Sequence, residues 1–218
     1  MKVFIKPFRA MGSVNAPPSK SFAHRYLIAA ALKKGETLIR NVGYSDDVKA
    51  TADCLRALGA KIKFSGGNAT VCGITKTPEG EITLNVGESG STLRFLMPVV
   101  AAMGVNAEFK IGKSLLNRPA DELLNVLSAH GEKIEKTDCG YRFSGKITAG
   151  AYSVSTDVSS QYASGLAFAL PLLNGESRLE ITGKNESEGY IGITLSVLEK
   201  SGIEFKKSGY KSIIFKKS

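Results

Sequence analysis

The sequence lacks a hydrophobic run long enough to cross a membrane. Its longest apolar stretch, Phe95 to Val105, contains Pro98 and is shorter than the roughly 18 residues that a spanning helix needs. Near the amino terminus, Lys6 and Pro7 stand where a secretory signal would continue its apolar core. We therefore expect no membrane partner and a cytoplasmic location.

Cysteine and histidine are scarce and poorly placed for metal binding. Cys54, Cys72 and Cys139 are odd in number and include no C-x-x-C pair, which argues against a disulfide framework and a zinc site. His24 and His130 have no carboxylate or cysteine at metal-ligand spacing. We therefore expect no bound metal and interpret both histidines as structural.

Acidic residues are too few to balance the basic ones. The 29 lysines and arginines exceed the 20 aspartates and glutamates, which gives a formal net charge of +9. Such an excess suits nucleic acid, anionic lipid or small anionic substrates. The basic residues form no cluster interleaved with aromatic residues, so a nucleic-acid partner is disfavoured. Many lysines lie beside turns and are typical of a solvated face.

The sequence does contain a threefold repeat. Three similar segments begin at Ser19, Ser89 and Ser159, at equal spacing, and each leads into an apolar stretch. A short strand-like piece that ends in glycine follows in every repeat, at residues 36–43, 106–112 and 176–183. The 218 residues are enough to bury a substantial core around such repeats.

A second helix follows in each repeat and stops at a glycine, as a left-handed helix cap favours: Gly59, Gly131 and Gly202. An alternating strand and a hairpin partner come next. The predicted fold is α+β, with three βαβαββ units about a pseudo-threefold axis, helices inside and sheets outside. The units are expected at about residues 14–78, 79–148 and 149–218.

The first helix of each unit should be buried. It is apolar on nearly every side, as residues 26–32 show. Pro98 and Pro171 interrupt the second and third of these inner helices, and we expect a kink or an early end at each.

The starts of the three inner helices should meet at one end of the domain. A helix start offers unpaired N–H groups and a partial positive charge, so serine and glycine there suit a phosphate or carboxylate. Serine also caps helices that bind nothing, but its repetition at all three starts favours a binding site. Lys20 and Arg25 could reach a second anionic group of the same ligand. Arg94 could do likewise or hold the helices together.

Several motifs resemble those of one enzyme family. Residues 17–25, PPSKSFAHR, look like the opening motif of the 5-enolpyruvylshikimate-3-phosphate (EPSP) synthases, and residues 87–94, GESGSTLR, are similar to their glycine-rich second motif. Residues 159–161, SSQ, and 187–190, SEGY, resemble two further ligand segments. The similarity covers essentially the whole chain in the right order. In residues 187–190, however, Glu-Gly stands where some members carry a basic residue and proline.

The resemblance implies a reaction and its substrates. The family transfers the enolpyruvyl group of phosphoenolpyruvate to the 5-hydroxyl of shikimate 3-phosphate and releases phosphate. This reaction belongs to the shikimate pathway, which leads to chorismate and the aromatic amino acids. It needs no metal or organic cofactor. The herbicide glyphosate occupies the phosphoenolpyruvate site.

The resemblance also implies roles for individual residues. The residues expected to face phosphoenolpyruvate are Lys20, Gly90, Arg118 and Gln161. Those expected to hold shikimate 3-phosphate are Ser21, Arg25, Ser159, Ser160, Ser187 and Tyr190. Among these, the serines would face its phosphate and Arg25 its carboxylate. Lys20 and Arg118 are expected to be catalytic.

The chain resembles only the amino-terminal half of this family. Members have two domains of this kind, so the resemblance implies a carboxy-terminal domain as a partner. Residues 1–13 would then form a strand, over Lys2 to Phe8, and a crossover that belong to that second domain. The acid–base carboxylates come mainly from the second domain in the family. We therefore expect this chain to be inactive by itself.

Two alternatives stay open. A sister family transfers enolpyruvyl to UDP-N-acetylglucosamine, but its opening motif carries asparagine where this chain has Ser21. Many of its members also place a reactive cysteine in a loop that here, at residues 112–117, has none. The second alternative is a module that binds a phosphorylated ligand without turnover.

Overall fold

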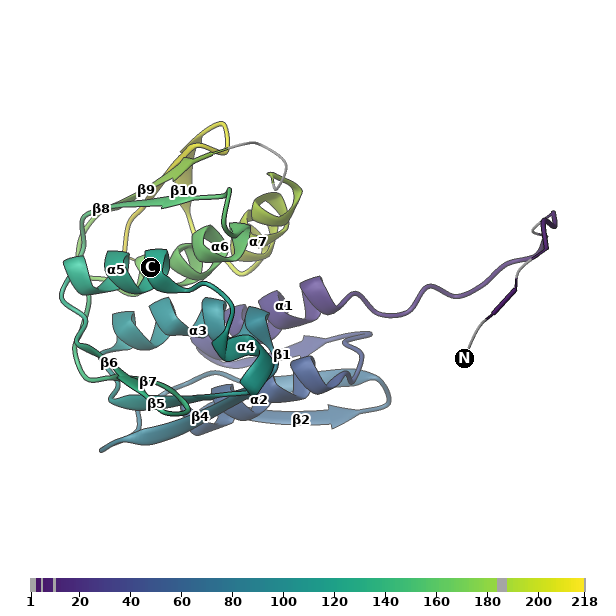
Figure 1. Cartoon of the computed structure of the whole chain (residues 1–218), viewed down its shortest axis with the longest axis horizontal. Coiled ribbons are helices and arrows are strands. Elements are labelled where there is room, and N and C mark those ends of the chain that lie inside the picture. Colours follow the sequence, from purple (N-terminus) through teal and green to yellow (C-terminus); the bar gives the residue numbers. More distant parts are fainter. Residues whose placement is uncertain (1–2, 5, 10, 184–187, 218) are drawn as a thin grey trace.

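The inner helices lie between sheets on the outside of the molecule (Figure 1). The computed structural model describes residues 3–4, 6–9, 11–183 and 188–217. Its helices are α1 (Lys20–Leu32), α2 (Asp46–Ala57), α3 (Gly90–Met103), α4 (Lys113–Leu116), α5 (Asp121–Ala129), α6 (Ser160–Ala169), the 3-10 turn η1 (Leu170–Leu172) and α7 (Glu188–Lys200). Its strands are β1 (Glu36–Ile39), β2 (Lys61–Ser65), β3 (Asn68–Cys72), β4 (Ile82–Gly87), β5 (Ala107–Ile111), β6 (Ile134–Thr137), β7 (Gly140–Phe143), β8 (Ala151–Ser155), β9 (Ser177–Thr182), β10 (Phe205–Ser208) and β11 (Ser212–Phe215).

The strands form one sheet per repeat, and this arrangement confirms the predicted fold class. The second and third sheets have the strand orders β4-β5-β7-β6 and β8-β9-β11-β10. In both, the first pair is parallel and the other pairs are antiparallel. The inward positions of β4 and β8 are apolar and fully buried, as at Leu84 and Val154.

The first sheet differs, because it has only three strands in the order β1-β3-β2. The expectation of a leading strand in the first unit is therefore wrong for this structure. Residues 11–19 are exposed and form no strand, and neither do residues 3–4 and 6–9 of the strand expected over Lys2 to Phe8. The edge of β1 where β4 and β8 lie in the other sheets is left without a neighbour within the described chain.

Helices α1, α3 and α6 are the buried inner helices that the sequence predicts. α3 and α6 pack closely because Gly165 has no side chain. A Cβ atom at this position would overlap the backbone carbonyl of Arg94. Pro171 lies in η1, directly after α6, where an early end was expected. α3 instead continues through Pro98 to Met103, so the helix does not end there.

The second helices end near the predicted glycines. Gly59, Gly131 and Gly202 have φ angles of 107°, 113° and 88°, in the left-handed region that glycine adopts without strain. α4 is a further short helix that the sequence pattern does not indicate. Among the described residues, no helix is long and apolar enough to span a membrane.

Candidate anion-binding site at the starts of the inner helices

Side-chain hydrogen bonds join the starts of α1 and α3. Nδ1 of His24 on α1 lies 2.6 Å from Oγ1 of Thr51 on α2. The Thr51 hydroxyl in turn lies 2.6 Å from Oγ1 of Thr92, in the first turn of α3. All three side chains are buried, so this chain of polar contacts fixes the relative position of the two helices.

A second set of hydrogen bonds joins α3 to α6. Nη1 of Arg94 donates to Oε1 of Gln161 at 3.0 Å, and Nε2 of Gln161 donates to Oγ of Ser91 at 2.8 Å. Arg25 on α1 completes the set, since its Nη2 donates to Oγ of Ser164 on α6 at 3.3 Å. The three helix starts therefore lie at one end of the domain, as the repeat predicts.

The serines at these starts differ in what they cap. Ser89 accepts a hydrogen bond from the backbone N–H of Thr92 at 3.3 Å, and Ser159 accepts one from Gln161 at 3.2 Å. Ser19 makes no such capping bond. The remaining N–H groups of each first turn point out of the helix end, where a partial positive charge favours an anion.

Arg25 is a buried cation with no carboxylate beside it among the residues that the structure describes. Its side chain is about 2% exposed and donates to Oγ1 of Thr194, to the backbone carbonyl of Ser21 and to Ser164. It forms no ion pair with any described residue, and desolvation lowers the pKa of its guanidinium to about 10. The guanidinium carbon lies 4.8 Å from the centre of the Phe95 ring. Buried charge of this kind is costly unless an anion compensates it.

Arg94 is the second such cation. It is about 9% exposed, and besides Gln161 it donates to the backbone carbonyl of Pro119 at 3.3 Å. Its Nε atom is buried without a hydrogen-bond partner, and it has no ion pair within the described part of the chain. Arg25 and Arg94 thus supply two uncompensated positive charges at the same end of the inner helices.

Lys20 is positioned by a carboxylate that the sequence analysis missed. Nζ of Lys20 lies 2.6 Å from Oδ2 of Asp47, in the first turn of α2. Both side chains are partly exposed, so the pair faces the solvent side of the helix starts. This exposed pair leaves the Lys20 ammonium accessible to a ligand.

The loop that carries Arg118 is tied to the same end. The carbonyl of Pro119 accepts hydrogen bonds from Arg94 and, at 2.7 Å, from the hydroxyl of Tyr162 on α6. Glu88 holds the other side of the loop, because its carboxylate accepts from Oγ of Ser114 at 2.5 Å and from the N–H of Leu115. The Ser114 hydrogen bond holds the pKa of Glu88 below its usual value.

The other expected residues take varied positions. Gly90 begins α3, and a Cβ atom there would lie 2.8 Å from Nη1 of Arg94. Ser21 and Ser160 are partly exposed in the first turns of α1 and α6, and Arg118 is exposed. Tyr190, on α7, is about 52% exposed, and its ring centre lies 6.0 Å from the Arg25 guanidinium carbon. Ser187 lies outside the described residues.

Three site residues were missed or left undecided by the sequence analysis. Arg94 was weighed there as either a ligand or a structural residue, and its hydrogen bonds to Gln161 and to the carbonyl of Pro119 show the structural role. No feature of the sequence marks Asp47 or Glu88 as a site residue, because each is an acidic residue near a helix start, where such residues are common. Only the contacts at Lys20 and at the 112–117 loop bring them to the site.

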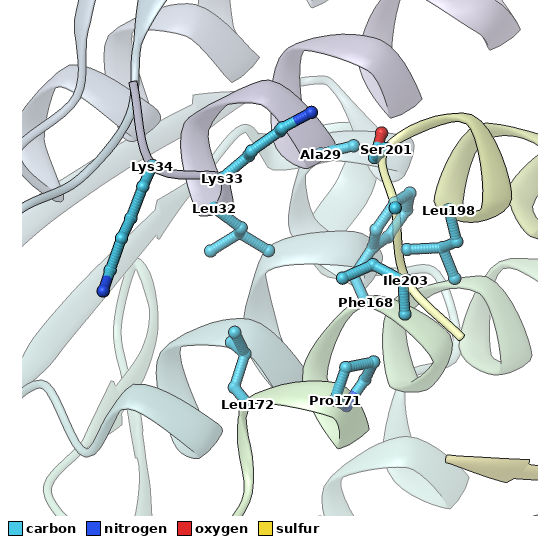
Figure 2. Close-up of a pocket in the computed structure, with 11 residues that line it drawn as sticks. Ala29, Leu32, Lys33, Lys34, Phe168, Pro171, Leu172, Leu198, Ser201 and Ile203 are labelled. Carbon is cyan, nitrogen blue, oxygen red and sulfur yellow. The ribbon is translucent and has the colours of Figure 1, made fainter. Parts of the chain in front are cut away.

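An apolar pocket lies at the opposite end of the inner helices (Figure 2). It has a volume of about 380 Å³ and is lined by residues at the ends of α1, α6 and α7, among them Leu32, Phe168 and Leu198. Helix C-termini carry a partial negative charge, so this end is the less favourable one for an anion. The surface at the helix starts is therefore the better candidate site for an anion.

Comparison with known proteins finds relatives in one enzyme family. The family model described as EPSP synthase (3-phosphoshikimate 1-carboxyvinyltransferase) matches residues 6–216. The chain is 38% identical over 218 residues to a 3-phosphoshikimate 1-carboxyvinyltransferase of Clostridium kluyveri, covering 98% of this chain and 51% of that protein. It is 40% identical over 220 residues to one of Clostridium botulinum, with 97% and 51% covered. The chain thus spans about half the length of these curated relatives.

Solved structures share the fold. The EPSP synthase of Acinetobacter baumannii superposes with a TM-score of 0.80 at 22% identity, over 95% of this chain and 47% of that one. The enolpyruvyl transferase NikO from Streptomyces tendae superposes with a TM-score of 0.65 at 17% identity, over 96% and 49%.

Proposed function

Because the chain belongs to the EPSP synthase family, we propose that it provides the amino-terminal half of an enzyme that transfers enolpyruvyl from phosphoenolpyruvate to shikimate 3-phosphate. Together with a carboxy-terminal domain, it would act as a 3-phosphoshikimate 1-carboxyvinyltransferase and release phosphate. Residues 1–13 would then supply a strand and crossover to that second domain.

The observation that carries this proposal is the pair of buried guanidiniums that have no carboxylate partner within the described part of the chain. Arg25 and Arg94 reach one end of the domain from two neighbouring inner helices. A substrate that brings phosphate and carboxylate groups would supply the missing negative charge and form charge-assisted hydrogen bonds there.

Shikimate 3-phosphate would bind across α1, α6 and α7. Ser159 and Ser160 at the start of α6 would donate to its phosphate, where the helix N–H groups also point. Arg25 retains guanidinium N–H groups beyond those that Thr194, Ser21 and Ser164 accept, and these could bind the shikimate carboxylate. Ser21 and Tyr190 would complete the site beside Arg25, together with Ser187.

Phosphoenolpyruvate would bind between the start of α3 and the 112–119 loop. Lys20, Arg118 and Gln161 would contact its phosphate and carboxylate, and Gly90 would let it approach the helix start closely. The Arg94 guanidinium, which Gln161 and Pro119 orient, would add positive charge behind it. Positive groups fixed before the reaction stabilise charge that develops in the transition state.

The chemistry divides between the two halves of such an enzyme. The shikimate hydroxyl adds to C2 of phosphoenolpyruvate and loses its proton while C3 gains one, and the tetrahedral intermediate then expels phosphate from C2 as C3 loses a proton. Lys20 and Arg118 would stabilise the phosphate as it leaves. The groups that protonate C3 and accept the hydroxyl proton would come mainly from the carboxy-terminal domain.

Titration calorimetry with shikimate 3-phosphate tests the proposal on this chain alone. We expect weak but measurable binding to the wild type, and a loss of about ten-fold or more in Arg25→Lys, which cannot form the bidentate contact. Arg178→Ala, which removes an exposed positive charge on β9, is the control for net charge. Equal affinity in Arg25→Lys and the wild type would remove Arg25 from the site.

A further inference from the structure

Three backbone carbonyls hold equivalent positions at the starts of the second helices. Asp47, Pro119 and Tyr190 each stand 12 residues before the glycine near which the second helix of their repeat ends. Each lies next to a basic residue of the candidate site, in order Lys20, Arg118 and Arg25. All three carbonyls accept hydrogen bonds from side chains, so side chains hold this part of the site in place in every repeat.

In the first repeat, the buried hydroxyl of Thr51 holds the carbonyl of Asp47. Oγ1 of Thr51 lies 3.2 Å from the Asp47 carbonyl oxygen, and Oγ1 of Thr92 on α3 lies 3.4 Å from the same oxygen. Thr92 also lies 2.6 Å from Oγ of Ser89, the residue directly before α3. Thr51, Thr92 and Ser89 are at most about 1% exposed, so bulk water would not replace a lost contact. Thr51 therefore connects Asp47 to the start of α3.

The ring of His24 completes this group of contacts. Its Nδ1 atom lies 2.6 Å from Oγ1 of Thr51, and its Nε2 atom is buried without a hydrogen-bond partner among the described residues. A proton on Nδ1 forms a hydrogen bond to Thr51, whereas a proton on Nε2 would have no acceptor. The contacts therefore favour a neutral ring that donates from Nδ1 to Thr51, which in turn donates to the Asp47 carbonyl.

In the third repeat, Thr194 on α7 has the position of Thr51. Each threonine stands four residues after the carbonyl that it contacts and eight residues before the glycine near which its helix ends. Oγ1 of Thr194 lies 3.1 Å from the carbonyl oxygen of Tyr190 and 2.8 Å from Oγ of Ser164 on α6. It also accepts a hydrogen bond from Nε of Arg25 at 2.6 Å, and it is fully buried. Thr194 therefore connects Tyr190 to Arg25.

The second repeat has no threonine at this position. Leu123 is there instead and is fully buried. Arg94 and Tyr162, from two inner helices, donate to the Pro119 carbonyl. The fold thus accepts an apolar residue at this position, which makes valine a suitable replacement for either threonine.

We propose that Thr51 and Thr194 are positioning residues that act on the two substrates separately, Thr51 on phosphoenolpyruvate and Thr194 on shikimate 3-phosphate. Thr51 holds Asp47, and through its carboxylate the Lys20 ammonium, beside the start of α3. Thr194 holds the Arg25 guanidinium, which is to bind the shikimate carboxylate. Both threonines are fully buried, so neither touches a substrate. This division rests on the proposed function, which names the two substrates.

Titration calorimetry with each substrate tests this division on the chain itself. Thr51→Val should weaken phosphoenolpyruvate binding by roughly ten-fold and shikimate 3-phosphate binding by less than about two-fold. Thr194→Val should show the reverse pattern. Thr51→Ser and Thr194→Ser keep the hydroxyl, so both should bind within about three-fold of the wild type. Because the two valine variants lose similar buried hydrogen bonds, each is the control for the loss of stability in the other.

A purely structural role would affect both substrates alike. Equal losses for the two substrates in a valine variant, or no loss for either, therefore overturn the proposal, and so does a serine variant that binds as weakly as its valine counterpart. If a valine variant does not fold, Thr92→Val replaces Thr51→Val, and Ser164→Ala replaces Thr194→Val. Each removes a neighbouring hydroxyl from the same group of contacts and should give the same pattern.

Nitrogen NMR spectra of the imidazole rings check the Thr51 contacts without a substrate. The chain has only two histidines, so His24→Gln assigns the signals. At neutral pH we expect the His24 proton on Nδ1 in the wild type and in Thr51→Ser, and a shift toward Nε2 in Thr51→Val. A wild-type ring protonated on Nε2, or an unchanged spectrum in Thr51→Val, overturns the role of Thr51. A wild type that shows the expected spectrum but binds neither substrate contradicts the proposed function, and with it the division between substrates.

Discussion

The guanidinium of Arg94 donates to the side-chain carbonyl of Gln161 at 3.0 Å, and this bond joins the starts of the second and third inner helices. The same glutamine donates to Ser91. One residue therefore serves both the fold and the candidate phosphoenolpyruvate site, and substitutions can separate the two roles.

Replacing Gln161 by glutamate should affect stability and binding in opposite ways. Gln161→Glu keeps an acceptor for Arg94 and adds a negative charge, so we expect the free energy of unfolding to be unchanged or raised by about 1 kcal/mol. The same charge should compensate Arg94 and repel an anion, so affinity for phosphoenolpyruvate should fall at least ten-fold. Denaturant unfolding and titration calorimetry measure the two effects. Gln161→Ala, the control, should lower both the free energy of unfolding and the affinity for phosphoenolpyruvate. Equal binding by both variants and the wild type would contradict the assignment.

The close packing of α3 on α6 should not tolerate a side chain at Gly165. Because a Cβ atom there would overlap the carbonyl of Arg94, Gly165→Ala should lower the free energy of unfolding by about 1–3 kcal/mol or more. Gly189, on α7, has open space around it, so Gly189→Ala should be neutral or stabilising by up to about 1 kcal/mol. Denaturant unfolding of both variants checks this contrast. A Gly165→Ala protein as stable as the wild type would show that the helices can separate without cost.

The regular part of the fold could be predicted because it is repeated. The equal spacing of the serine starts and the nearly equal spacing of Gly59, Gly131 and Gly202 predict the helices and their ends from local preferences. The leading strand of the first unit was predicted by the same pattern but is absent among the described residues, because a strand also needs a partner and residues 11–19 are exposed. α4 was missed because it has only four residues and depends on the carboxylate of Glu88, far from it in the sequence.

The candidate site could be predicted only as far as its helix starts. Three serine starts in a threefold repeat indicate one convergent anion site, and the resemblance adds Lys20, Gly90 and Gln161. Asp47 lies 27 residues from Lys20 in the sequence, and no local pattern brings the two together. The missing ion-pair partners of Arg25 and Arg94 are likewise a property of the packed structure. Residues far apart in the sequence form these contacts, so the local sequence pattern does not predict them.

His24 should make the protein less stable in mild acid. Burial, helped by the nearby charges of Lys20 and Arg25, lowers its pKa from 6.5 to about 4, although Asp47 opposes this shift. Between those values the unfolded chain binds a proton that the folded chain does not, so the free energy of unfolding should fall as the pH drops from 6.5 to 4. The total loss should be on the order of 3 kcal/mol.

Denaturant unfolding at pH 7.5, 5.5 and 4.5 measures this loss. His24→Gln can keep a hydrogen bond to Thr51 but cannot titrate, so it should show a smaller fall than the wild type. Other titrating groups are common to both proteins and cancel in the comparison. The same fall in both proteins would show that His24 does not contribute.

A methyl group at Gly90 should disturb the phosphoenolpyruvate side of the site. In Gly90→Ala the new Cβ atom would lie 2.8 Å from Nη1 of Arg94, so the guanidinium must shift. In an enzyme reconstituted with a carboxy-terminal half, glyphosate inhibition should weaken by about ten-fold, roughly the 1.4 kcal/mol of one lost hydrogen bond. Shikimate 3-phosphate affinity should change much less, because Arg25 and Ser160 do not contact Gly90. Unchanged inhibition would place Gly90 outside the site.

The chain by itself should bind substrate without catalysing enolpyruvyl transfer. Turnover needs a proton donor to C3 and an acceptor for the hydroxyl proton, and each positioned group typically contributes about 100 to 10,000-fold. Lys20 is the only basic residue of the candidate site that is paired with a carboxylate, Asp47, within the described chain, and we expect one such pair to be insufficient for both roles. Without a closing domain the substrates also stay solvated, and the orientation effect that closure provides can be worth roughly 7 to 11 kcal/mol.

Phosphate release from the two substrates should therefore be at background with this chain and should appear when a separately produced carboxy-terminal half is added. Asp47→Asn in the mixture should lower the rate if the pair takes part in proton transfer, with Asp53→Asn, on the same helix and paired with Arg56, as the control. Rapid phosphate release by this chain alone would show that both acid–base groups lie within it.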